Sequence, residues 1–242
     1  MPPENQSRGR NRNTMNTATV GIMMLETNFP RPPGDIGSPQ TWDFPVQMRT
    51  VGGASAQKVV HEDPRALLDM FVQVGRELVA DGCTGLATSC GFLSLMQNEL
   101  KDALGVPFAS SPLMQVPMVE ATLPTNQEVG VLTISRESLS AAHLLAAGAR
   151  GDIAMEGLPR DGAFASAIFD DAPEFNVAAC HSEMCATAKR LVSQHETIGA
   201  IMLECTNMAP YAADIAQITG RPVYSVVSFL NWFQAGLKPA RF

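Results

Sequence analysis

Two stretches of the chain follow one pattern, Thr84-Gly-Leu-Ala-Thr-Ser-Cys-Gly-Phe92 and Ile198-Gly-Ala-Ile-Met-Leu-Glu-Cys-Thr-Asn207. In each, a short apolar run typical of a buried strand leads into a cysteine among small or polar residues. Pro107 follows Cys90 by 17 residues and opens the next apolar run, and Pro222 follows Cys205 at the same spacing. The shared order and spacing indicate two related halves rather than a solenoid of short repeats.

Short apolar runs alternate with longer amphipathic ones along the chain, which predicts strands and helices in turn. The predicted strands cover 20–25, 84–88, 106–109, 129–134, 153–155, 198–203 and 223–227. The predicted helices cover 64–79, the segment behind the second strand to about 104, 138–147, 178–193 and 209–218. Alternating strands and helices form parallel sheets that are covered on both faces. The sequence therefore predicts an α/β fold of two similar lobes, each a parallel sheet flanked by helices.

We expect the first lobe to span 17–125 and the second 126–227, with the tail 228–242 joining the first lobe. Residues 1–16 carry three arginines but no apolar segment of the kind that a secretion signal needs, so we predict a disordered arm. Residues 27–46 form a long Pro-rich segment, which we interpret as an ordered flap. Arg31 or Asp35 in this flap can reach a bound molecule, although a dimer contact or plain packing fits the segment equally well.

The composition excludes several classes of protein. The net charge is −7, from 24 acidic and 17 basic residues, which argues against a broad nucleic-acid surface. No apolar run approaches the roughly 20 residues of a membrane span. Five irregularly spaced cysteines suit a reducing compartment, so we expect a cytoplasmic protein. His181 and Cys185 can share a helix face, but no second ligand pair accompanies them, and we expect no metal site.

The two repeated cysteines lie where a ligand is expected. Ligands of open parallel sheets bind outside the carboxyl ends of the strands, and Cys90 and Cys205 each follow a predicted strand. The unpaired N–H groups and the positive dipole end of a helix start hold anions there and lower the pKa of a thiol. Small or polar neighbours let a substrate approach the backbone; these are Ser89, Gly91, Thr206 and Asn207. For Cys83, Cys180 and Cys185 we expect a packing role.

These motifs resemble those of the aspartate/glutamate racemase superfamily, which includes glutamate, aspartate and hydantoin racemases, maleate isomerase and arylmalonate decarboxylase. The resemblance covers nearly the whole chain after the arm. It rests on both cysteine motifs, on Val20-Gly-Ile-Met-Met-Leu-Glu26 and on Val129-Gly-Val-Leu-Thr-Ile-Ser135. It implies two lobes related by pseudo-twofold symmetry, with the active site between them. A homo-oligomer, a dimer or larger, is also expected.

The resemblance further implies a cofactor-independent racemase of an amino acid or a related α-substituted carboxylate. Cys90 and Cys205 would be the catalytic residues, one as thiolate and one as thiol on opposite faces of the α-carbon. Backbone N–H groups at both helix starts would hold the carboxylate, together with Ser89, Thr206 and Asn207. Ser135 and Asn28, which follow the first strands of the two halves, are expected to face the ligand.

The chain departs from glutamate racemases at three places. Those enzymes carry Asp-Ser after the first strand, Asn after the first cysteine and His two places after the second. This chain has Glu26-Thr27, Gly91 and Asn207 there. Three alternatives therefore stay open: an isomerase or decarboxylase of the same superfamily that uses one cysteine, a hydantoin racemase, and a non-catalytic protein that binds small acids.

Overall fold

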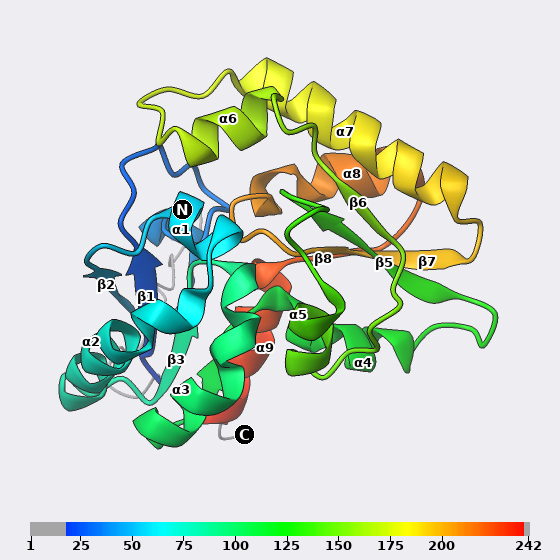
Figure 1. Ribbon diagram of the computed structural model, residues 1–242. Helices are drawn as coiled ribbons and strands as arrows, with labels where there is room; N and C mark the ends of the chain where they lie inside the picture. Colours follow the sequence, from blue (N-terminus) through cyan, green and yellow to red (C-terminus); the bar gives the residue numbers. More distant parts are fainter. Residues whose placement is uncertain (1–17, 240–242) are drawn as a thin grey trace, which may run out of the picture.

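The chain forms two parallel four-stranded sheets with the same internal order (Figure 1). The order is β2-β1-β3-β4 in the first sheet and β6-β5-β7-β8 in the second. In both, the strand that comes first in the chain lies between the second and the third. The computed structural model describes residues 18–239, so the predicted arm 1–16 lies outside the described residues. The predicted α/β fold of two similar lobes is confirmed.

The strands that lie inside each sheet are the most apolar ones. Every residue of β1, β3 and β7 is buried, as expected for parallel strands covered on both faces. The strands are β1 (Val20–Leu25), β2 (Val46–Val51), β3 (Gly85–Thr88) and β4 (Phe108–Ala109), then β5 (Glu128–Thr133), β6 (Met155–Gly157), β7 (Ile198–Leu203) and β8 (Val223–Tyr224).

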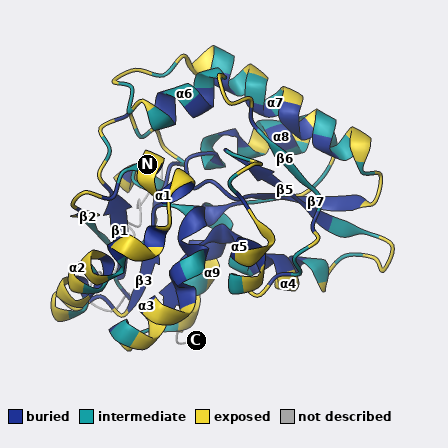
Figure 2. Cartoon of the chain, in the orientation of Figure 1, coloured by how far each residue is buried: buried dark blue, intermediate teal, exposed yellow. Residues whose placement is uncertain are grey.

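Helices cover the sheets, and their outward faces are exposed (Figure 2). The α-helices are α1 (Ala56–His61), α2 (Leu68–Ala80), α3 (Gln97–Leu104), α4 (Val116–Glu120), α5 (Ala141–Ala146), α6 (Ala163–Phe169), α7 (Val177–Gln194), α8 (Ala212–Thr219) and α9 (Val226–Leu237). Short 3-10 helices precede several of them, among them η4 (Gly91–Met96) before α3. Within residues 18–239, no helix has the length and apolar character needed to cross a membrane.

The C-terminal helix differs from the sequence prediction. The predicted strand 223–227 ends at Tyr224, because the Ser225 hydroxyl accepts a hydrogen bond from the N–H of Val227 and caps α9. Phe229 and Leu230 of α9 pack with Val20 and other buried residues of the first sheet. The chain therefore returns from the second sheet to cover the first.

Truncating the contact between α9 and the first sheet should destabilise the protein. Phe229 is 3% exposed, and Phe229→Ala should lower the free energy of unfolding by about 3–5 kcal/mol, because it leaves a cavity in the core. Trp232 lies on the same helix and is 57% exposed, so Trp232→Ala should cost about 1 kcal/mol or less. Urea denaturation measures both, and equal losses would contradict this packing.

Candidate active site

A small cavity lies where residues from the ends of both sheets meet. Its volume is about 20 Å³, room for about one water molecule. The residues that line it and that matter here are Thr27, Phe29, Arg31, Ser89, Cys90 and Phe92 from the first half and Ile134, Glu204, Cys205 and Asn207 from the second. Residues of both repeated cysteine motifs thus enclose one buried space.

The two cysteines occupy matching positions. Cys90 follows β3 in an extended conformation and begins η4, and Cys205 follows β7. The sulfur of each forms a hydrogen bond with the backbone two residues further along, at Phe92 and Asn207 respectively. All five cysteines are free thiols. The repeat seen in the sequence is therefore a repeat of local geometry.

The expected lowering of the thiol pKa at these positions is wrong. Burial raises the pKa of Cys90 well above its ordinary value, and a negative charge on the nearby Glu204 raises it further. The pKa of Cys205 is raised by the same two causes in the same order. Removing a thiolate from water outweighs the stabilisation that backbone N–H groups provide. Burial therefore favours the neutral thiol form of both cysteines.

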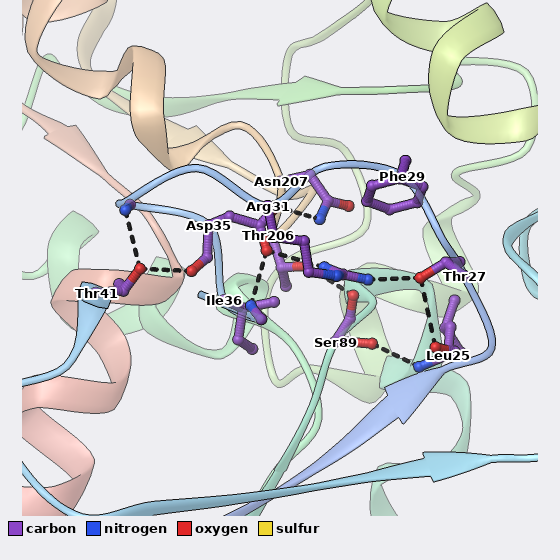
Figure 3. Close-up of polar contacts among 12 residues, drawn as sticks. Leu25, Thr27, Phe29, Arg31, Asp35, Ile36, Thr41, Ser89, Thr206 and Asn207 are labelled. Carbon is purple, nitrogen blue, oxygen red and sulfur yellow. Dashed lines mark hydrogen bonds and ion pairs between the residues drawn. The ribbon is translucent and has the colours of Figure 1, made fainter. Parts of the chain in front are cut away.

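A hydrogen bond between the lobes joins the two cysteine loops. The Thr206 hydroxyl donates to the Ser89 carbonyl at 2.6 Å, and the Ser89 hydroxyl accepts from the N–H of Leu25 at 2.8 Å (Figure 3). Thr206 is fully buried and lies behind the cavity wall rather than on it. Its contact fixes the loop that carries Cys205 against the loop that carries Cys90.

The segment 27–46 docks on the second cysteine loop through Asp35. This buried carboxylate accepts hydrogen bonds from Arg31 at 2.9 Å, from the N–H of Gly37 at 2.7 Å and from the Asn207 side chain at 2.7 Å (Figure 3). The Arg31 guanidinium also donates to Thr27 and lies 4.5 Å from the centre of the Phe29 ring. Of the two flap residues singled out in the sequence, Arg31 lines the cavity and Asp35 positions it.

Two of the expected ligand-facing residues lie away from this cavity. Asn28 donates its side-chain amide to Asp171 at 2.8 Å and is exposed. Ser135 donates its hydroxyl to Ser138 and lines a neighbouring, more open cavity with His61. By contrast, Ser89 and Asn207 line the space beside the cysteines. The structure thus brings part of the predicted set together around one cavity.

Glu204 is the site residue that sequence reasoning missed. Its side chain is fully buried, and one carboxyl oxygen, Oε2, accepts a hydrogen bond from the Thr133 hydroxyl at 2.8 Å. Burial raises the pKa of Glu204 to about 8. Gly91 borders this carboxyl group so closely that a Cβ there would overlap it, which explains the glycine after Cys90. The available signal was a lone acidic residue directly after the six apolar or small residues of β7.

Comparisons of sequence identify relatives among lyases. No protein-family profile matches the chain. A dimethylsulfoniopropionate lyase from Durusdinium sp. clade D is 26% identical over 235 residues, covering 90% of this chain and 75% of that protein. Dimethylsulfoniopropionate lyase 7 from Emiliania huxleyi (strain CCMP1516) is 25% identical, covering 90% of this chain and 67% of that protein.

Comparisons of structure identify the fold. A glycine-to-cysteine variant of arylmalonate decarboxylase, in a sulfate-associated form, superposes with a TM-score of 0.63 at 16% identity, covering 90% of this chain and 92% of that one. Aspartate racemase from Picrophilus torridus gives a TM-score of 0.54 at 12% identity, covering 90% and 93%. The chain therefore has the fold of the aspartate/glutamate racemase superfamily, as the sequence motifs predicted.

Removing the charge of Asp35 should loosen the docked segment. In Asp35→Asn, Arg31 loses its carboxylate partner, and the new amide N–H group can face the N–H groups that the carboxylate accepted from. The free energy of unfolding should therefore fall by about 3 kcal/mol. The matched control is Asp81→Asn, which breaks an exposed ion pair with Arg49 and should cost less than about 1 kcal/mol. Urea denaturation of both variants checks this, and an Asp35→Asn loss no larger than the control's would contradict the docking.

Proposed function

We propose that this chain is a cofactor-independent enzyme that removes the α-proton of a small carboxylate by means of Cys90 and Cys205. The observation that carries the proposal is the pair of thiols, which come from matching strand ends of the two lobes and line one buried cavity. Transfer of the α-proton requires a base close to the α-carbon and donors that stabilise the negative charge developing on the carboxylate. A thiolate is the base, and the cavity wall supplies the donors.

Several residues of the wall fit a carboxylate substrate. Arg31 is the permanently charged cation among the lining residues, and its guanidinium is held in place by Asp35. Ser89 and Asn207 add a hydroxyl and an amide next to the two cysteines. These groups would neutralise a carboxylate and spread the charge that forms as the proton leaves.

Racemisation is the first reaction that this arrangement supports. One cysteine, as thiolate, takes the α-proton from one face of the carbon, and the other, as thiol, returns a proton from the opposite face. The two cysteines exchange roles in the reverse direction, which suits two identical side chains on matching elements. An amino acid or a related α-substituted carboxylate is the substrate of this reaction, and the fold shared with an aspartate racemase supports it.

Elimination is the second candidate, and the lyase relatives favour it. With a β-sulfonium carboxylate, the thiolate takes the α-proton, the C–H electrons form a carbon–carbon double bond, and the bond from the β-carbon to sulfur breaks. The bonding electrons leave with a neutral dialkyl sulfide, and an α,β-unsaturated carboxylate remains. Phe92 adds an aromatic ring to the cavity wall, and aromatic rings attract cations such as a sulfonium group.

Exchange of the α-hydrogen in D2O tests the proposal. Wild-type protein is incubated with a panel of amino acids and with dimethylsulfoniopropionate, and we expect α-deuterium in the former or dimethyl sulfide and acrylate from the latter. Where the replaced thiol is the base, Cys90→Ser or Cys205→Ser should lower the rate of α-exchange or of dimethyl sulfide release by about 10²–10⁴-fold. Cys185→Ser, on α7 outside the cavity, is the control that should keep full activity.

The two serine variants separate the candidate reactions. Racemisation needs both thiols, so both variants should lose it. Elimination needs one base, so one variant should keep most of its activity. Absence of exchange and of product over the whole panel would contradict the proposal, and tight carboxylate binding without turnover would indicate a binding protein instead.

A further inference from the structure

Glu204 lines the cavity and has one carboxyl oxygen without a hydrogen-bond partner. Oε2 accepts a hydrogen bond from the Thr133 hydroxyl at 2.8 Å, whereas Oε1 is buried and has no hydrogen-bond partner. A buried polar atom left unpaired costs roughly 1–3 kcal/mol. Such an atom beside two thiols, in a cavity wall, indicates a contact that a bound ligand completes.

The charges around Glu204 favour its neutral form. The other titratable or charged groups that line the cavity are Cys90, Cys205 and Arg31. Glu204 is fully buried, Cys205 is buried and Cys90 is partly exposed, and a negative Glu204 raises the pKa of each thiol. A thiolate and a glutamate anion beside each other would therefore oppose one another, and a substrate carboxylate would add a third negative charge. The pKa of about 8 allows Glu204 to carry a proton at neutral pH.

We propose that Glu204 acts as a neutral carboxylic acid whose Oε1 hydroxyl donates a hydrogen bond to the carboxylate of the bound substrate. The Thr133 hydroxyl donates its hydrogen bond to Oε2, so the proton of the neutral acid belongs on Oε1. Arg31 supplies charge and Glu204 supplies a directional donor that strengthens as negative charge builds on the carboxylate. This inference rests on the carboxylate substrate class of the proposed function and makes Glu204 a substrate-binding residue.

Alkylation of the thiols tests this without any turnover. Iodoacetate carries a carboxylate and iodoacetamide does not, and both react with the same thiolate. The ratio of the iodoacetate rate to the iodoacetamide rate is therefore independent of the fraction of thiolate. Rates at Cys90 and Cys205 are measured by peptide mass spectrometry between pH 7 and 9.5. In the wild-type protein, the ratio should be constant near pH 7 and fall about tenfold or more above pH 8, because the ionised Glu204 then repels iodoacetate.

Glu204→Gln is the decisive variant, since its amide keeps the shape and a donor but cannot ionise. Its ratio should stay high and independent of pH. Glu204→Met removes the donor, so its ratio should be low throughout. At Cys185 in the wild-type protein, outside the cavity, the ratio should not show the fall above pH 8.

Three results would overturn the inference. They are a wild-type ratio that does not change with pH, an equal fall in Glu204→Gln, and a fall of the same size at Cys185. The wild-type profile alone decides the matter if a variant does not fold. Turnover in D2O together with a wild-type ratio that does not change with pH would reject the role of Glu204 and keep the proposed function. The expected fall of the ratio above pH 8 without any turnover would keep the role of Glu204 and reject the proposed function.

Discussion

The hydrogen bond from the Thr206 hydroxyl to the Ser89 carbonyl sets the geometry of the whole site. Ser89 precedes Cys90 and Thr206 follows Cys205, so one 2.6 Å contact between the lobes fixes both cysteine loops. Thr206 is shielded from water completely and Ser89 almost completely, which strengthens the bond and makes its loss expensive. Together with the contact between Asp35 and Asn207, this bond holds the strand ends of the two sheets around a common cavity.

Burial then determines the chemistry. It raises the pKa of both thiols and of Glu204, so the closed cavity favours few negative charges. A volume of about 20 Å³ is also too small for an organic carboxylate, so the proposed substrate would enter only if the wall moved. The docked segment 27–46 contributes Phe29 and Arg31 to that wall and is held by Asp35 on one side and by Asp171 on the other.

The sequence predicted the buried parts of the fold best. The strands 20–25 and 198–203 have the bounds that their apolar runs indicate, because burial on both faces demands continuous apolar residues. The edge strand β2 was missed, since it is half-exposed and carries Gln47 and Arg49. The apolar run 223–227 was ambiguous, and the cap at Ser225 decides where the strand ends and α9 begins.

The site followed the same logic. The cysteine pair could be predicted because the repeat places both at strand ends, where parallel sheets gather their ligands. The position of Asn28 could not, because the path of the segment 27–46 depends on its contact with Asp171, 143 residues away in the chain. Glu204 was overlooked because a charge next to a cysteine in the sequence does not reveal whether both side chains enter one cavity.

Carboxymethylation followed by mass spectrometry of the intact chain tests most directly whether Cys90 and Cys205 share one cavity. After limiting and then saturating treatment with iodoacetate, fragmentation of the intact protein locates every adduct. If the two sulfurs face one small space, a group on either cysteine blocks the other, and the chains should carry one adduct at Cys90 or at Cys205 but not at both. Rapid modification of both cysteines in the same folded chain would contradict a shared site.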